Sequence, residues 1–188
     1  MDVSKKAISH KDNRDTTTGF ILFLDKMIEY SAIGIFILTV VALFLFLGAD
    51  VVVRYLTTQS LGWPSEMPNL LFPWLVMGGI VAASSRGQHV AVNAIIKVLN
   101  PRVTRFLMLV MQIVVVAAFS YLSYISIDVV KIAGNQIFPI SGISSSYAYI
   151  ALVYGFGAIA LTALTNILWF LVDASAFDQR VTQTEVTE

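Results

Sequence analysis

Apolar residues gather in four long runs along the chain, separated by short polar connections. The runs cover about residues 30–55, 67–85, 106–127 and 146–172. A hydrocarbon core of about 30 Å requires about 20 helical residues, so each run is long enough to cross it. Helices are required because unpaired backbone groups are costly in lipid. The pattern predicts an all-α integral membrane protein with four transmembrane helices, in a membrane domain over residues 20–173.

Polar segments surround and connect these runs. Residues 1–19 and 174–188 are polar and are expected to form two tails. Between the second and third runs, apolar residues recur at i, i+3, i+4 and i+7, and Pro101 ends the pattern; they are Val92, Ile95, Ile96 and Leu99. This spacing predicts a short amphipathic helix over residues 90–100, lying at the membrane interface. A loop is expected before the fourth run, over residues 134–145.

The positive charges indicate an orientation. The segment before the first span holds five Lys and Arg, and the connection between the second and third spans holds four. The other two connections hold one each, Arg54 and Lys131. Because Lys and Arg accumulate on the cytoplasmic side, the nine-to-two ratio predicts that the N- and C-termini are both cytoplasmic.

The composition agrees with a membrane protein and excludes several other classes. Hydrophobic residues make up 57% of the 188 and charged residues only 13%, and the mean hydropathy is +0.78. A soluble domain is nearer 25% charged. The formal net charge of zero gives no indication of nucleic acid. The absence of cysteine excludes disulfides, iron–sulfur clusters and thiolate metal sites.

Two charged pairs are expected at span ends. Asp50 and Arg54 are four residues apart near the outer end of the first span, and Asp128 and Lys131 are three apart near the outer end of the third. Residues at these spacings are neighbours on a helix, so both are predicted to be end-of-span ion pairs. The pairs serve either as anchors at the headgroup level or as polar contacts to another subunit.

Aromatic and acidic residues mark the outer half of the second span. Trp63 fits an interfacial anchor. Trp74 lies about one third of the way into the span, so packing or a subunit contact is equally compatible with its position. Glu66 precedes the span, where an acid complements the helix dipole; the alternative is a pair with a basic group such as Arg54.

Small and basic residues mark the inner half of the same span. Gly78 and Gly79, with the alanines four residues on, permit a close approach of helices, either within this chain or to a second membrane protein. Arg86 is an inner anchor or fixes the end of the span to its neighbours. His89 as a metal ligand is not expected, since the only other histidine is His10. No metal site is therefore predicted.

The span centres carry no acidic or basic residue. A carrier that acts alone usually needs such a residue or a broken helix at mid-membrane. No nucleophile–base pair, phosphate-binding glycine loop or substrate site is apparent, so the chain is predicted to be a non-enzymatic helper subunit. One alternative is a small dimeric exporter, which depends on a glutamate in the first span that residues 33–48 lack. Another is the membrane anchor of a respiratory complex, although no paired histidines are present for haem.

The polar, aromatic and small residues in and around the second span resemble those of a known family. The order and spacing of several residues resemble those of the small, DctQ-like membrane subunit of tripartite ATP-independent periplasmic (TRAP) transporters. These residues are Arg54, Trp63, Glu66, Trp74, Gly79, Arg86 and His89-Val90, together with Pro139 before the fourth span and Tyr147 in it. The resemblance covers about residues 28–172. Ser65 departs from it, because relatives often carry a second acid there.

The resemblance implies partners that the residues alone do not reveal. Such subunits bind a large many-helix membrane subunit that holds the substrate and sodium sites, in the bacterial inner membrane. A periplasmic substrate-binding protein delivers an organic acid such as sialic acid or a C4-dicarboxylate. The small subunit is then expected to be a scaffold without a cofactor of its own. Its expected interface or structural residues are Arg54, Trp63, Glu66, Trp74, Gly78, Gly79, Arg86 and His89.

Overall fold

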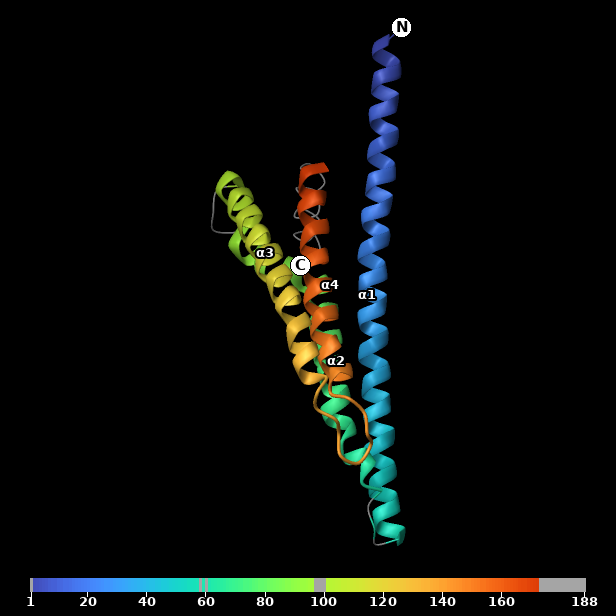
Figure 1. Ribbon diagram of the computed structural model, residues 1–188. Coiled ribbons are helices and arrows are strands. Elements are labelled where there is room, and N and C mark those ends of the chain that lie inside the picture. The colour runs from blue at the N-terminus through green and yellow to red at the C-terminus, as the bar shows by residue number, and fades with distance from the viewer. Residues whose placement is uncertain (1, 58, 60, 97–100, 173–188) are drawn as a thin grey trace.

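The described part of the chain is helical apart from its connections (Figure 1). The computed structural model describes the backbone of residues 2–57, 59, 61–96 and 101–172, and the side chains of residues 19, 21–57, 59, 61–85, 103 and 106–168. The elements are α1 (Asp2–Thr57), the 3₁₀ turn η1 (Trp63–Ser65), α2 (Met67–Ile96), α3 (Pro101–Ala133) and α4 (Ser146–Val172).

Four of these helical segments are long and apolar enough to cross a membrane: Ile21–Thr57, Trp63–Ser85, Phe106–Ala133 and Ser146–Leu168. The predicted all-helical architecture with four spans is therefore confirmed. The start of α4 and the end of α3 lie at the same end of the bundle as the end of α1, so consecutive spans run in opposite directions (Figure 1).

Two of the predicted boundaries differ from the structure. Helix α1 begins at Asp2, so residues 2–19, expected as a tail, continue the helix beyond the other three (Figure 1). Helix α2 likewise continues to Ile96, and a separate interfacial helix over residues 90–100 is not confirmed; residues 97–100 lie outside the described part. The reason is that extending an existing helix costs far less than nucleating a new one, and no proline interrupts either segment.

Helices α2 and α4 form the centre of the bundle. Helix α1 packs mainly against α2, α3 packs mainly against α4, and α2 and α4 pack against each other. The core contains Ala32, Val81, Ala158 and Ile159. Because alanines dominate its buried positions, the backbones approach closely, which is how helices associate in lipid. The outer faces of α1 and α3 remain exposed.

Candidate interface and outer cap

The loop between α3 and α4 folds into a compact hairpin at the end of the bundle that the charge distribution predicts to face outward, which we call the outer end. Phe138 N–H donates to the Ile143 carbonyl at 2.9 Å, Gly142 N–H to the Phe138 carbonyl at 2.9 Å, and Ser145 N–H to the Gln136 carbonyl at 2.9 Å. Gly142 has a φ of 70°, a left-handed conformation that favours glycine. We call residues 135–145 the outer hairpin.

Glu66 fastens the outer hairpin to the start of α2. Its carboxylate accepts the backbone N–H of Ile140 at 2.9 Å and that of Ser141 at 2.8 Å, and the residue is only 7% exposed. The expected partners were the helix dipole or Arg54. Glu66 does directly precede α2, and its carboxylate also has two main-chain donors, because the hairpin would otherwise leave these N–H groups without an acceptor.

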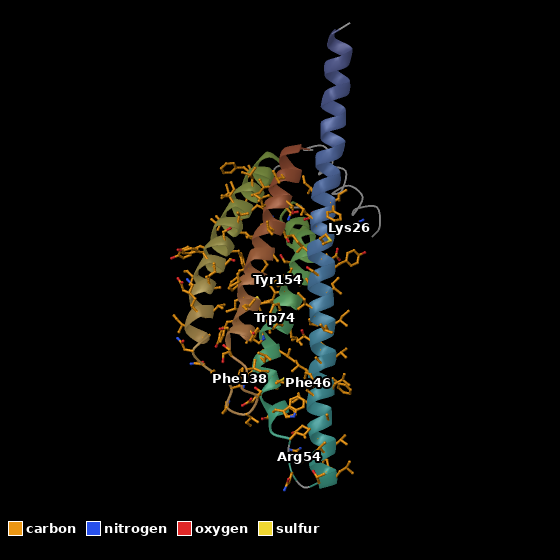
Figure 2. The ribbon with its side chains drawn as sticks, turned by 45° about the vertical axis from the view of Figure 1, so that its right-hand side comes forward. Lys26, Phe46, Arg54, Trp74, Phe138 and Tyr154 are labelled. Atoms are coloured by element: carbon orange, nitrogen blue, oxygen red, sulfur yellow. The ribbon has the colours of Figure 1, made fainter. Side chains whose placement is uncertain are left out.

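The turn η1 fills the space between α1 and the outer hairpin. The Trp63 ring contacts Phe46 of α1 edge to face, with ring centroids 5.6 Å apart. Gly62 has a φ of 79° and lies against the Ile140 side chain. Trp63 is still 38% exposed, so one side packs inward and the other remains available to lipid or a partner. Figure 2 shows Phe46 and Phe138 at this end of the bundle.

The two predicted end-of-span pairs have different outcomes. Lys131 Nζ lies 3.0 Å from Asp128 Oδ1, and both side chains are largely exposed. In the described part of the chain Asp50 and Arg54 form no ion pair. Asp50 Oδ1 accepts the backbone N–H of Leu61 at 3.0 Å, because the chain turns back after α1 and this amide needs an acceptor. Arg54 is exposed.

Trp74 joins three helices in the middle of the bundle. Its indole N–H donates to the Tyr147 carbonyl in the first turn of α4 at 2.8 Å. Its ring lies 6.2 Å from that of Tyr154, whose hydroxyl is 2.8 Å from Ser31 Oγ on α1. Figure 2 shows Trp74 and Tyr154 close together. Trp74 thus makes internal contacts linking α2 to α4 and, through Tyr154, to α1.

The glycine pair lies at the contact between α1 and α2. A Cβ at Gly78 would lie 3.1 Å from both the Ala32 carbonyl oxygen and the Phe36 backbone nitrogen. A Cβ at Gly79 would meet only the Phe36 ring, at 3.4 Å. Gly78 therefore permits close backbone approach within the chain, whereas Gly79 is more tolerant.

Arg86 and His89 lie in the second half of α2. Their side chains are outside the described part, so their predicted contacts stay predictions.

Several contacts were missed by the sequence analysis. Thr165, only 3% exposed, donates to Asp25 Oδ1 at 2.6 Å and so joins α4 to α1. Gly155 faces Met77, whose Sδ would lie 2.5 Å from a Cβ there. The i, i+3 spacing of Thr162 and Thr165 was the available signal for a polar face on α4.

Several polar side chains in the described spans join helices, whereas others, such as Thr39, Ser126 and Thr162, donate to a carbonyl of their own helix. Gln112 donates to the Ala163 carbonyl at 3.3 Å, and Ser123 to the Val153 carbonyl at 3.2 Å, both from α3 to α4. Among the residues described, no group of three His, Asp or Glu side chains could hold a metal ion. This geometry defines a class: a multi-pass, four-span helical membrane protein with a capped outer end.

Comparison with known proteins identifies the family within that class. The model of the DctQ component of tripartite ATP-independent periplasmic transporters matches residues 32–172. The chain belongs to this family and is a DctQ-like small TRAP subunit, which confirms the resemblance drawn from its residues. The family is one of transporter components.

Curated relatives agree with this assignment. Two Haemophilus influenzae proteins, whose names propose them as TRAP transporter small permease proteins, are similar to the chain. One is 26% identical over 131 residues, 70% of this chain and 77% of that protein. The other is 28% identical over 155 residues, 79% of this chain and 92% of that protein.

A third relative is much longer. The uncharacterized protein y4mM of Sinorhizobium fredii is 32% identical over 140 residues, which is 74% of this chain. The match spans only 26% of the length of y4mM.

Proposed function

We propose that this chain is the non-catalytic small subunit of a sodium-coupled TRAP transporter for organic acids, of the sialic acid or C4-dicarboxylate class. It lies in the bacterial inner membrane with both termini in the cytoplasm. It acts as a scaffold that holds the large transport subunit through α1 and α2. Substrate and sodium bind in that large subunit, so this chain requires no cofactor or metal of its own.

The polar side chains inside the bundle support this proposal most directly. A transport path needs polar groups that line a cavity at mid-membrane. Here Ser31 and Tyr154 pair with each other, and Gln112 and Ser123 bond to carbonyls of α4. These groups stabilise a fixed bundle, which suits a scaffold beside a moving subunit.

The longer relative also supports a role beside a partner. A segment similar to this chain occupies about a quarter of the Sinorhizobium protein, so it occurs there joined to a larger stretch of polypeptide. This is the arrangement expected of a small subunit that works next to a large one.

The outer hairpin helps to dock the periplasmic binding protein. Glu66 holds the hairpin in one conformation before any partner arrives, which lowers the ordering cost of binding. Ile137 and Ile140 are 65% and 58% exposed on the same hairpin, which leaves apolar surface for contact.

Co-purification and transport assays test the proposal. The tagged chain is expressed with the many-helix membrane protein encoded next to its gene, purified, and reconstituted with the matching binding protein. We expect the large subunit to co-purify, and uptake of organic acid to require both membrane subunits and an inward sodium gradient. Sodium-dependent uptake by this chain alone, or failure to recover a large subunit, would refute the scaffold role.

A further inference from the structure

The end of the bundle opposite the outer hairpin, which we call the inner end, holds two carboxylates on one side of α1. Asp25 and Glu29 are four residues apart, so they are neighbours on the helix, and both are half-buried. They lie inside the apolar segment Ile21–Thr57. Acidic residues within a membrane span usually pair with basic or other polar groups. Asp25 accepts a hydrogen bond from Thr165 of α4 at 2.6 Å, and a cation at this level would balance the two negative charges.

The contact between α1 and α2 repeats along the two helices. Gly79 of α2 lies against the Phe36 ring of α1, which would be 3.4 Å from a Cβ there. The two helices run in opposite directions (Figure 1). Seven residues make almost two full turns, so a contact recurs seven residues back on one helix and seven residues further along the other. The position that corresponds to Phe36 is Glu29, and the position that corresponds to Gly79 is Arg86.

Helix α4 places Arg86 at the same level independently. Met77 of α2 lies against Gly155, and α2 and α4 run in the same direction. Arg86 follows Met77 by nine residues, so its backbone is level with Leu164, nine residues after Gly155. The next residue, Thr165, is the one that donates to the α1 carboxylate. Two separate contacts therefore place the backbone of Arg86 at the level of the two carboxylates.

We propose that Arg86 forms an ion pair with Glu29 and so closes the inner end of the bundle. Together with the hydrogen bond from Thr165 to Asp25, this pair joins the inner ends of α1, α2 and α4. It corresponds to the role of Glu66 at the opposite end, where a carboxylate holds the outer hairpin to the start of α2. Arg86 is then a positioning residue of the bundle and not an anchor to lipid phosphate. The inference concerns this chain alone and does not rest on the proposed function.

Lys26 is the competing cation at this level. It precedes Glu29 by three residues, and its side chain is exposed. Figure 2 shows Lys26 on α1 at the inner end. An exposed pair between neighbours on one helix contributes little to stability and joins no second helix. Removal of Lys26 and removal of Arg86 therefore have different expected results.

Cross-linking in membranes tests the register. The chain has no cysteine of its own, so the thiols are those introduced. Glu29→Cys with Arg86→Cys places both thiols at the proposed contact, and a short bis-methanethiosulfonate reagent has a reach similar to that of the ion pair. Met27→Cys with Arg86→Cys is the matched control, since Met27 is 56% exposed and points about 160° away from Glu29 around α1. We expect an intramolecular cross-link in the first pair and not in the second; equal yields in both pairs, or none in the first, would overturn the contact.

Charge exchange tests the ion pair. We expect Arg86→Gln and Glu29→Gln each to lower the midpoint of thermal unfolding of the purified chain by about 5 °C. The double variant should lose little more than either single variant, because the second change removes a group that is already unpaired. Arg86→Glu combined with Glu29→Arg should recover most of the loss. Lys26→Gln removes the same charge from an exposed position and should leave the midpoint nearly unchanged.

The alternatives give other results. Losses that add in the double variant, without recovery on charge exchange, would assign Arg86 to lipid phosphate and overturn the pair. Coupling of Glu29 to Lys26 in place of Arg86 would overturn it as well. A fall in recovery of the large subunit with Arg86→Gln, at an unchanged thermal midpoint, would make Arg86 a partner contact instead. The proposed function would survive each of these results, since it depends on recovery of the large subunit by the unmodified chain.

Discussion

At the scale of single residues, Glu66 shows how one carboxylate organises the outer end of the bundle. It accepts two backbone N–H groups of the hairpin, at 2.9 and 2.8 Å. In Glu66→Gln one acceptor becomes a donor, so one of the two amides loses its partner. We expect the hairpin to be cleaved several-fold faster in limited proteolysis, and the thermal transition of the purified protein to fall.

Asp128 provides the control for this prediction. Asp128→Asn makes the same chemical change at an outer carboxylate, but the side chain is 63% exposed and pairs only with Lys131. Exposed ion pairs contribute little to stability. Equal proteolysis of the Glu66 and Asp128 variants would show that the Glu66 carboxylate does not hold the hairpin.

Gly78 sets the distance between α1 and α2. A side chain there meets main-chain atoms of Ala32 and Phe36, which move only with the helix itself. We expect Gly78→Leu to lower the free energy of unfolding by about 1–3 kcal/mol, the usual cost of overpacking, as measured by denaturant titration in detergent.

Gly34 is the matched control for Gly78. It lies on α1 with nothing within 4 Å of the position that a Cβ would take. Gly34→Leu should leave the free energy of unfolding nearly unchanged. A similar loss in both variants would attribute the effect to glycine replacement in general, not to the contact at Gly78.

At the scale of helices, Trp74 connects α2 to the first turn of α4 through the Tyr147 carbonyl. Trp74→Phe keeps an aromatic ring and removes the N–H donor. We expect a loss of about 0.5–1.5 kcal/mol in the free energy of unfolding, since hydrogen bonds between membrane helices are of this order.

A double-mutant cycle separates this hydrogen bond from the neighbouring ring contact. Tyr154→Phe removes the hydroxyl that pairs with Ser31 but keeps the ring beside Trp74. We expect the two losses to add nearly independently, because the two hydrogen bonds share no atom. Strong coupling between them would mean that the three helices respond as one network.

The four spans were predictable because each follows from a local property, a run of apolar residues long enough to cross lipid. The helix ends were less predictable. Residues 2–19 and 90–96 continue a helix because helical structure propagates from the neighbouring span. The hydrophobicity of these residues does not indicate this.

The partners of the charged residues could not be inferred from spacing. Asp50 and Arg54 have the separation of a helical ion pair, yet Asp50 bonds to the loop amide of Leu61. Glu66 bonds to a hairpin more than seventy residues away in the sequence. In both cases the deciding factor is a backbone N–H brought close by the fold, and such donors have no signature in the sequence.

At the scale of the whole molecule, the internal hydrogen bonds and ring contacts hold some parts of the bundle together and leave others exposed. The outer end is closed by η1 and the outer hairpin, and the centre is joined by Trp74 and Tyr154. Helix α1 packs against α2 and α4 on one side, and its other side is exposed. A bundle with a rigid cap and an open flank can attach to a partner without changing its own shape, which is what the proposed scaffold role requires.

The orientation of the bundle decides whether that cap can meet a periplasmic protein. Nine Lys and Arg flank the predicted inner side and two the outer side, so the termini are expected in the cytoplasm. Alkaline phosphatase, active only in the periplasm, should be inactive when fused after Glu188 and active when fused after Ala133, where α3 ends. Green fluorescent protein at the same two points should give the opposite result. Active phosphatase at Glu188 would place Glu66 and the outer hairpin in the cytoplasm, where a periplasmic partner cannot reach them.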